Sequence, residues 1–313
     1  MLIFQALESF RYAMLPPGIM HMNIGWIGTG IMGAAMADRL QAASHTLHVF
    51  SRTRAKAEPL LIRGATWCVS PADVARTAEI VFTIVGFPAD VEKVYFGPNG
   101  IFSVAKPACS VVVDMATTPP ELARRIAVEA AARGIAALDA PITGGDVGAR
   151  EGILAIMVGG AAAAFERALP LLRLMGKNIE HVGGPGAGQQ AKLVNQILIA
   201  GTMIGLCEAL LLAARAGLDR GKLLTLLGGG AAGSWALQRL GPKIVGGDYM
   251  PGFMAEHFLK DLGLALREAT ALGLKLPGVE LAQQLYAKTC ALGHGRNGTQ
   301  ALILALEELN AER

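Results

Sequence analysis

The sequence predicts an α/β Rossmann-type N-terminal domain followed by an all-α C-terminal domain. Short β-rich runs alternate with amphipathic helical runs from Met22 to about Gly184, which is typical of an open, largely parallel sheet covered by helices. A glycine-rich turn stands between the first strand and the first helix of this series. After the glycine-rich segment 183–188, strand patterns stop and only helical patterns follow.

The predicted strands are short runs rich in β-branched and aliphatic residues. They lie at 22–27, 46–50, 79–85, 110–115, 136–140, 153–158 and 178–182. Helical periodicity separates several of them, most clearly at 33–43 and 119–134. The helical runs of the second half lie at 187–216, 219–229, 234–244, 255–273, 278–293 and 299–313. We therefore expect an α/β domain over 22–184 and a helical domain over 185–313, linked by the first long helix.

Residues 1–21 are predicted to be an extension in front of the first strand. Glu8 and Arg11 stand where an export signal has its apolar region, so this segment is a poor export signal. Four cysteines are scattered along the chain and form no CxxC pair. This usage is typical of reduced core cysteines, with neither a disulfide framework nor a zinc site. The sequence thus predicts a cytoplasmic protein without a bound metal.

The charge and hydropathy patterns exclude several kinds of partner. A net charge of +3 with no basic run is too small to indicate a nucleic-acid partner. The apolar segment 193–214 contains Asn195, Gln196 and Glu208, which favours a buried or interfacial helix over a membrane span. Because one small domain cannot cover a helix that is apolar on all sides, we expect a homodimer or homotetramer formed through the C-terminal domain.

The glycine-rich turn has the GxGxxG spacing of a dinucleotide site, with Gly28, Gly30 and Gly33. The first glycine permits the tight turn, the second lets the backbone approach a pyrophosphate, and the third packs the helix on the strand. Glycine-rich turns are common, but this one follows a strand and opens a helix, which favours cofactor binding. The residues predicted to bind the cofactor here are Gly28, Thr29, Gly30, Ile31, Met32 and Gly33.

The end of the second strand indicates which dinucleotide is bound. An NAD site usually has Asp or Glu there, whereas this chain has Ser51, followed by Arg52, Thr53 and Arg54. The missing carboxylate removes repulsion toward a 2′-phosphate, and Arg52 can bind that phosphate through two hydrogen bonds. Alternatively, the arginines are only solvated loop charges. The sequence favours NADP, and NAD stays open.

Lys192 is the only formal charge between Glu180 and Glu208. On a helix it shares one face with Gln189, Asn195 and Gln196, and this polar patch lies near the domain boundary, where clefts form. Apolar surroundings lower the pKa of a lysine by disfavouring its charged form, which would suit a general acid. The alternative is a lysine at a helix start whose ammonium group reaches solvent.

Two further patches are candidates for substrate binding. Thr143 offers a hydroxyl, and Gly144 and Gly145 offer backbone N–H groups to a carboxylate, although glycines could serve there only to allow positive φ angles. Phe253, His257, Lys260 and Asp261 recur at helical spacing on one face. A lone histidine such as His257 is more often a hydrogen-bonded pocket wall than a base.

These motifs, taken in order, resemble the β-hydroxyacid dehydrogenase family over nearly the whole chain from Met22. The resemblance rests on GWIGTGIMG at 25–33, DMATTPP at 114–120, DAPITGGDVGAREG at 139–152, GPGAGQQAKLVNQ at 184–196 and FMAEHFLKDLGLAL at 253–266. Several runs, among them GGDVGAREGILAIMVGG, look most like the tartronate semialdehyde reductase branch of the family.

The resemblance implies roles for individual residues. Lys192 matches the catalytic lysine, and Asn195 matches the amide that positions the substrate beside it. Thr143, where the family usually has serine, completes a carboxylate site with Gly144 and Gly145. The residues that match further cofactor contacts are Val85, Thr117 and Lys260, and those that match the substrate pocket are Phe253 and Asp261. Ala116 and Gly86 depart from the family pattern, which usually has serine and proline there.

The expected activity is NADP(H)-preferring interconversion of a small 3-oxo acid and its 3-hydroxy acid, with 2-hydroxy-3-oxopropionate as the favoured 3-oxo acid. The alternatives are a 3-hydroxyisobutyrate dehydrogenase and a glyoxylate or succinic semialdehyde reductase. An imine reductase would share the fold and the cofactor, but such enzymes typically lack a lysine at the position of Lys192. A non-catalytic NADP-binding scaffold would be expected to have lost Lys192 or the carboxylate turn, and both are present.

Overall fold

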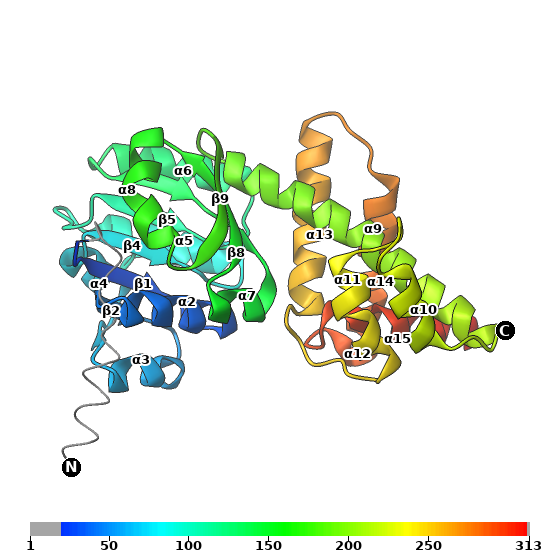
Figure 1. Ribbon diagram of the computed structural model, residues 1–313. Coiled ribbons are helices and arrows are strands. Elements are labelled where there is room, and N and C mark those ends of the chain that lie inside the picture. The colour runs from blue at the N-terminus through cyan, green and yellow to red at the C-terminus, as the bar shows by residue number, and fades with distance from the viewer. Residues whose placement is uncertain (1–19, 312–313) are drawn as a thin grey trace, which may run out of the picture. The chain divides into compact units, whose positions relative to one another are not determined.

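Nine strands form one sheet in the first unit of the computed structural model, which describes residues 20–311 (Figure 1). They are β1 (Asn23–Ile27), β2 (Thr46–Phe50), β3 (Thr66–Trp67), β4 (Ile80–Thr83), β5 (Val111–Asp114), β6 (Ala136–Asp139), β7 (Ile142–Thr143), β8 (Leu154–Gly160) and β9 (Gly176–Gly183). The strand order is β3-β2-β1-β4-β5-β6-β8-β7, with β9 paired to β8.

The direction of the strands changes twice along this strand order, once on each side of β8. Six strands run parallel to one another, in the order β3, β2, β1, β4, β5 and β6. β8 is antiparallel to both β6 and β7. The last strand, β9, is again parallel to β8. The prediction of a largely parallel sheet is confirmed. β3 and β7 were not predicted, because a strand of two residues is too short to show an alternating pattern.

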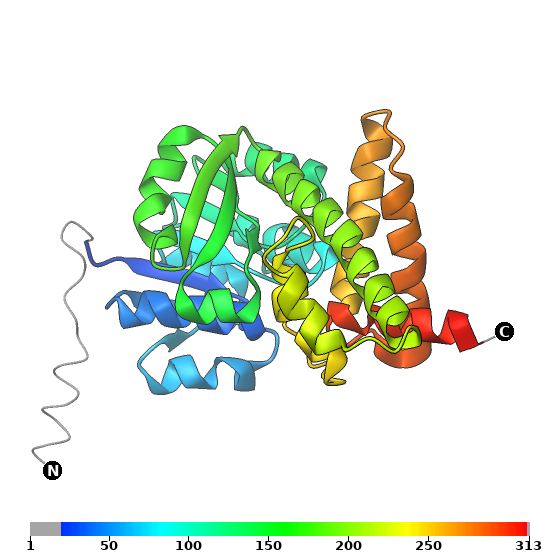
Figure 2. The ribbon, with the colours of Figure 1, turned by 45° about the vertical axis from the view of Figure 1, so that its right-hand side comes forward.

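Helices cover both faces of this sheet (Figure 2). The first unit contains α2 (Ile31–Ala42), α3 (Glu58–Ile62), α4 (Pro71–Thr77), α5 (Pro88–Phe96), α6 (Pro120–Ala131), α7 (Gly145–Glu151) and α8 (Ala162–Leu172), with short 3₁₀ turns η1 (Arg54–Ala57) and η2 (Ile101–Ser103). Alternation along the strands separates two apolar layers. Ile80 and Phe82 of β4 belong to one, and Val81 belongs to the other.

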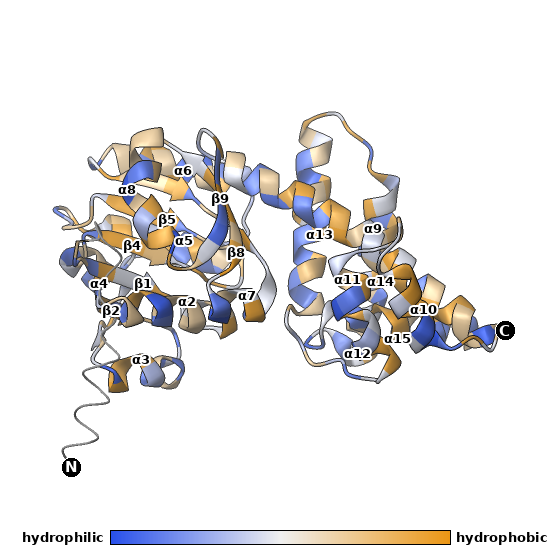
Figure 3. Cartoon of the chain, viewed as in Figure 1, coloured by the Kyte–Doolittle hydropathy of each residue, from blue (hydrophilic) through white to orange (hydrophobic). Residues whose placement is uncertain are grey.

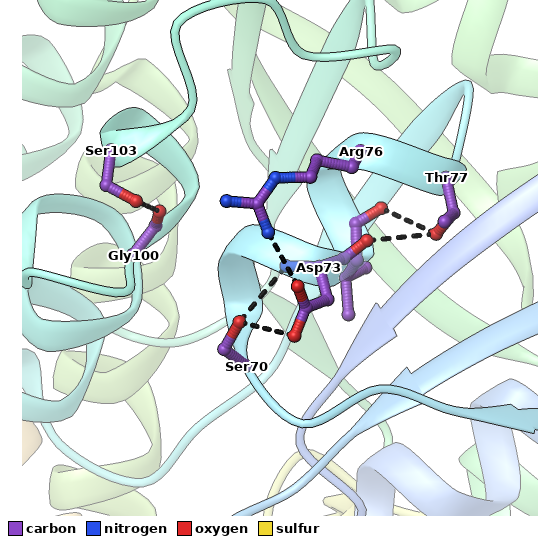
Figure 4. A network of polar contacts seen from close by, with 7 residues as sticks. Ser70, Asp73, Arg76, Thr77, Gly100 and Ser103 are labelled. Carbon is purple, nitrogen blue, oxygen red and sulfur yellow. Dashed lines mark hydrogen bonds and ion pairs between the residues drawn. The ribbon is translucent and has the colours of Figure 1, made fainter.

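The start of α4 shows how local sequence sets a helix terminus in this unit (Figure 4). The Asp73 amide donates to the Ser70 hydroxyl at 3.1 Å, and that hydroxyl donates to the Asp73 carboxylate at 2.8 Å. Arg76 binds the other oxygen of the same carboxylate at 2.6 Å. Pro71, whose missing N–H costs nothing at the first helical position, completes the cap.

The second unit is entirely helical in the part of the chain that the structure describes. Its elements are most of α9 (Ala187–Arg215), then α10 (Arg220–Leu227), α11 (Trp235–Arg239), α12 (Gly241–Val245), α13 (Ala255–Ala271), α14 (Pro277–Thr289), the π-helical turn η3 (Cys290–His294), the 3₁₀ turn η4 (Thr299–Ala301) and α15 (Leu302–Ala311). This agrees with the predicted fold class. The first unit extends to Lys192 and the second begins at Leu193, so the boundary lies inside α9.

The predicted extension over 1–21 lies outside the described residues except at Met20 and His21. The predicted domain limit at 184/185 precedes α9, whereas the compact units divide at Lys192, because the first residues of α9 pack with the α/β unit. Lys192 is therefore the last residue of the first unit.

Helix α9 is strongly apolar along most of its length (Figure 3). Among residues 20–311 it is the one helix whose length and composition would suffice to cross a membrane. A core helix passes the same test, and α9 supplies Leu193, Met203 and Leu206 to the core of the helical unit. Its buried face also carries the polar side chains of Gln189, Lys192 and Gln196. These polar residues distinguish α9 from a simple apolar span.

Candidate active site

The glycine-rich turn after β1 leaves space for a ligand at only one of its three glycines. A Cβ atom on Gly28, whose φ is +103°, would overlap the Ile84 carbonyl oxygen, and a Cβ on Gly33 would overlap the Gly28 carbonyl oxygen. A Cβ on Gly30 would meet no atom within 4 Å. The fold itself thus requires Gly28 and Gly33, whereas Gly30 opens the space beside the start of α2, where a dinucleotide fold binds its pyrophosphate.

The neighbours of this turn also fit a dinucleotide. Thr29 is buried, and within the described residues its hydroxyl has no hydrogen-bond partner. Ile31 is exposed at the start of α2 and Met32 is half-buried, while Val85 lies beside Gly28. A polar ligand bound beside Gly30 could supply a hydrogen-bond partner for the buried Thr29 hydroxyl.

Ser51, Arg52 and Arg54 follow the end of β2, and their side chains have different partners. The Ser51 hydroxyl accepts a long hydrogen bond of 3.5 Å from the Thr29 amide and so joins β2 to the glycine-rich turn. Arg52 is 85% exposed and pairs with Asp90 at 3.1 Å. Thr53 is exposed at the start of η1, and the Arg54 guanidinium lies over the Trp67 ring, 5.4 Å from its centroid. To bind a phosphate, Arg52 would exchange its exposed ion pair with Asp90 for the new partner.

A buried polar network supports the loop after β5. The Asp114 carboxylate accepts hydrogen bonds from the Thr83 hydroxyl at 2.8 Å and from the Ala116 amide at 3.3 Å. The Tyr95 hydroxyl lies 3.1 Å from that of Thr83, and burial raises the pKa of Tyr95 well above its ordinary value. The network fixes the loop that carries Thr117. Sequence analysis missed it, because single polar residues in apolar runs give no periodic signal.

The start of α9 is bound to the sheet through Asp139, at the end of β6. The Asp139 carboxylate accepts hydrogen bonds from the Gly186 amide at 2.8 Å and from the Gln189 amide at 2.9 Å. Burial raises the pKa of this carboxyl, and the amide hydrogen bonds oppose that shift. Sequence analysis did not select Asp139. The available signal was an acidic residue that ends an apolar strand run, where a buried charge needs partners.

The Gln189 side chain connects α9 to the loop after β5. Its Nε2 atom donates to the Ala116 carbonyl oxygen at 2.8 Å, and its Oε1 atom accepts from the Thr118 amide at 3.0 Å. Thr117, predicted to contact the cofactor, lies between these two residues. Lys192 follows Gln189 by three residues in α9 and is only 7% exposed.

The turn predicted to bind a carboxylate joins β7 to α7. Thr143 is the last residue of β7 and is half-buried. Gly144 and Gly145 have φ angles of +131° and +65°, a region that favours glycine. Gly144 is exposed, so the turn remains accessible. The positive φ angles account for the glycines, and the accessible backbone is what carboxylate binding would need.

The remaining predicted residues lie in the helical unit, where a second buried network joins α9 to α13. The Asn195 amide donates to Gln196 Oε1 at 2.7 Å, and Gln196 Nε2 donates to Asp261 Oδ2 at 2.7 Å. Lys260 pairs with the other oxygen of Asp261 at 3.0 Å. The Asp261 carboxylate is thus 1% exposed and held between an amide and an ammonium group.

One expectation for this unit was wrong. Phe253 does not share a helix face with His257, because α13 begins at Ala255, after the cap residue Met254. Met254 instead forms an isolated antiparallel bridge with Gly298, which keeps this segment extended. The Phe253 ring still lies 6.4 Å from the His257 ring and is 37% exposed.

The structure gathers the predicted residues into two groups, one in each unit. In the first unit, the cofactor candidates at 28–33, 51–53, 85 and 117 follow the carboxyl ends of the adjacent parallel strands β1, β2, β4 and β5. This edge is where open α/β sheets bind ligands. In the second unit, Asn195 donates to Gln196 within α9, and Gln196 donates to Asp261 of α13.

Both units match families of known dehydrogenases. Residues 23–183 match the NAD binding domain of 6-phosphogluconate dehydrogenase. Residues 186–306 match the NAD-binding domain of NADP-dependent 3-hydroxyisobutyrate dehydrogenase. The two matches divide the chain just before α9.

Full-length relatives agree with these matches. "Probable 3-hydroxyisobutyrate dehydrogenase-like 1, mitochondrial" of Arabidopsis thaliana is 48% identical over 289 residues, covering 92% of this chain and 86% of that protein. The 2-hydroxy-3-oxopropionate reductase of Escherichia coli strain K12 is 41% identical over 286 residues, covering 91% and 97%.

Two solved structures are also similar to this chain. The 3-hydroxyisobutyrate dehydrogenase of Mycobacterium tuberculosis with L-serine has a TM-score of 0.82 at 31% identity, covering 92% of this chain and 99% of that one. Psf3 in complex with NADP+ and 2-OPP has a TM-score of 0.82 at 25% identity, covering 90% and 99%.

The open space at Gly30 yields a test of the cofactor site. Gly30→Ala should change the free energy of unfolding by no more than about 0.5 kcal/mol, because the new methyl group meets no protein atom and the φ of −70° suits alanine. NADPH affinity should fall by roughly 5- to 150-fold, since overpacking costs about 1–3 kcal/mol. Thermal unfolding and fluorescence titration with NADPH measure the two effects. Unchanged NADPH affinity would place the pyrophosphate elsewhere.

Proposed function

Since the chain belongs to the β-hydroxyacid dehydrogenase family and is an NAD(P)-dependent oxidoreductase acting on CH–OH groups, we propose that it interconverts a small 3-oxo acid and its 3-hydroxy acid. The favoured 3-oxo acid is 2-hydroxy-3-oxopropionate. The observation that carries this proposal is the burial of Lys192 on α9. Lys192 lies about one turn beyond Gln189, the residue through which α9 binds the loop that carries Thr117.

In this proposal Lys192 is the general acid in reduction and the general base in oxidation. When the cofactor is bound, its nicotinamide ring supplies or accepts the hydride. Lys192 donates a proton from Nζ to the carbonyl oxygen during reduction and takes it back during oxidation of the alcohol. Asn195, the next residue but two in α9, is proposed to orient the same oxygen. Its amide already donates to Gln196 at 2.7 Å, which fixes its orientation.

The accessible turn at the end of β7 supports a substrate that carries a carboxylate. The Thr143 hydroxyl and the amides of Gly144 and Gly145 can donate to carboxylate oxygens without a competing side chain at the glycines. A neutral aldehyde would leave these donors unpaired, which costs binding energy. Phe253 and Asp261 are proposed as further substrate-binding residues.

The exact acid is proposed from the sequence of this turn and the region after it. The run over 144–160 looks most like that of tartronate semialdehyde reductases, and a reductase of 2-hydroxy-3-oxopropionate is 41% identical to this chain. A 3-hydroxyisobutyrate dehydrogenase is the second candidate, favoured by the 48% identical relative with that name. A glyoxylate or succinic semialdehyde reductase is the third.

NADP is the proposed cofactor form because Ser51 replaces the usual acid and the 85% exposed Arg52 could exchange its ion pair with Asp90 for one with a 2′-phosphate. We also propose a cytoplasmic enzyme that forms a homodimer or homotetramer. On α9, Val194, Leu198 and Leu212 are 59%, 68% and 72% exposed, although they are aliphatic. Covering such a stripe favours association. Light scattering at micromolar concentration distinguishes these oligomers from a 32.6 kDa monomer, which would contradict the proposal.

Substrate preference is tested by steady-state assays over tartronate semialdehyde, methylmalonate semialdehyde, succinic semialdehyde and glyoxylate with NADPH and NADH. We expect the highest kcat/KM for tartronate semialdehyde with NADPH. One methyl or hydroxyl group is worth about 1–3 kcal/mol in such a pocket, so the margin should be roughly 10- to 200-fold. A higher kcat/KM for methylmalonate semialdehyde would identify a 3-hydroxyisobutyrate dehydrogenase instead.

The cofactor preference is tested at Arg52, with Arg54 as a matched control. Arg52→Ala should raise KM for NADPH much more than KM for NADH, because only NADPH carries the 2′-phosphate. Arg54→Ala removes an equal charge two residues away, but that guanidinium lies over Trp67, so its effect on the two cofactors should be equal. If Arg52→Ala affects both cofactors equally, Arg52 does not bind the 2′-phosphate.

The proton donor is tested with Lys192→Met, which keeps the aliphatic stem and removes the ammonium group. Turnover should fall by about 10²- to 10⁴-fold, the usual contribution of a positioned proton donor. NADPH affinity should change little, and the pH profile should lose the limb that reports the lysine. Lys222→Met is the control, because the Lys222 side chain is 87% exposed on α10. A folded Lys192→Met variant with wild-type turnover would show that Lys192 is not the acid.

A further inference from the structure

The side chain of Gln189 makes two buried hydrogen bonds to one loop. Its amide nitrogen donates to the Ala116 carbonyl at 2.8 Å, and its amide oxygen accepts from the Thr118 amide at 3.0 Å. A single planar group therefore holds the backbone on both sides of Thr117. Gln189 has no exposed surface, so water cannot replace either bond.

The backbone amide of Gln189 is held as well, by the carboxylate of Asp139 at the end of β6. Its amide donates to the Asp139 carboxylate at 2.9 Å, and the Gly186 amide donates to the other oxygen of the same carboxylate at 2.8 Å. Gly188 permits this close approach, since a Cβ there would overlap the Asp139 carbonyl oxygen and lie 2.6 Å from that of Met157. Gln189 is thus a junction between β6, α9 and the loop after β5.

Lys192 takes its position from this junction. It follows Gln189 by three residues in a continuous helix, which puts the two side chains on one face and separates them by about 4.5 Å along the axis. A helical turn is stiff, so a displacement of Gln189 relative to the loop would move Lys192 relative to Thr117. The same face of α9 continues into Leu193 and Gln196, which are also buried.

We propose that Gln189 is a positioning residue that sets the distance between Lys192 and the loop carrying Thr117. Through this amide, the chain keeps its proton donor in register with the loop whose Thr117 is proposed to contact the cofactor. The proposal rests on the proposed function in two respects, the role of Lys192 as proton donor and the contact of Thr117 with the cofactor. The competing explanation is that Gln189 only satisfies two buried backbone groups and contributes to stability alone.

The first experiment compares Gln189→Met with Gln41→Met. Methionine fills the space of glutamine but cannot bond to Ala116 or Thr118. Hydrogen exchange at the Thr118 amide should accelerate, the Kd for NADPH should rise, and kcat should fall by up to about 100-fold, as for a misplacement of about 1 Å. Gln41 also bonds two backbone carbonyls, of Leu60 at 3.1 Å and Arg63 at 3.0 Å. Its variant should lose stability with kcat and the Kd for NADPH unchanged.

The second experiment uses Gln189→Glu, in which protonation of the new carboxyl group should restore the two hydrogen bonds to the loop. A protonated glutamic acid can still donate to the Ala116 oxygen and accept from the Thr118 amide. An ionised one has no donor and repels the Ala116 oxygen. Because burial raises the pKa of a carboxyl above its ordinary value of about 4.3, kcat relative to wild type should be highest in acid and fall as the pH rises through that raised pKa. Exchange at Thr118 should accelerate over the same pH range.

The outcomes separate the proposal from the function on which it rests. Faster exchange at Thr118 in Gln189→Met, combined with wild-type kcat and NADPH affinity, would overturn the positioning role and leave a purely structural one. A pH-independent ratio of kcat between Gln189→Glu and wild type would overturn it as well, and this test does not depend on whether the methionine variant folds. Failure of the proposed function appears elsewhere, as a Lys192→Met variant that keeps wild-type turnover.

Discussion

The buried carboxylate of Asp139 holds the first turn of α9 against the sheet, and the site in the α/β unit depends on that contact. The amides at the start of a helix have no partners within the helix, and here two of them donate to one carboxylate. Burial raises the pKa of Asp139, so the carboxylate is tolerated only because these amides bind it. From this fixed turn, Gln189 reaches the loop after β5 and Lys192 continues along the same buried face.

The strand order brings several loops to one edge of the sheet. Because β1, β2, β4 and β5 are parallel neighbours, their carboxyl ends form one edge, and the loops that leave it carry Gly30, Arg52, Val85 and Thr117. Beyond β6, β8 runs antiparallel to both of its neighbours, β6 and β7, and the turn at Gly144 follows directly after β7. The proposed cofactor edge and the proposed carboxylate turn thus belong to one sheet. Family membership agrees with that arrangement.

Sequence patterns predicted the fold and the glycine-rich turn after β1, because periodicity and glycine spacing are local properties of the chain. The strands β1 and β2 and the helical second unit were all predicted. The parts that were missed depend on contacts between distant residues. Asp139 and Gln189 are 50 residues apart, and Thr83 and Asp114 are 31 apart, so no local pattern links them. Phe253 was placed on a helix because the spacing fitted, whereas the bridge between Met254 and Gly298 keeps it outside α13.

The central claim is that α9 presents Lys192 to the oxygen of a 3-hydroxy acid whose carboxylate is bound at the β7–α7 turn. A crystal structure with NADP+ and glycerate, the reduction product of 2-hydroxy-3-oxopropionate, measures this directly. The account predicts Lys192 Nζ within about 3.2 Å of the substrate C3 hydroxyl oxygen, with the carboxylate on Thr143, Gly144 and Gly145. A glycerate bound with its carboxylate on that turn, but with its C3 hydroxyl against another proton donor and away from Lys192, would contradict it.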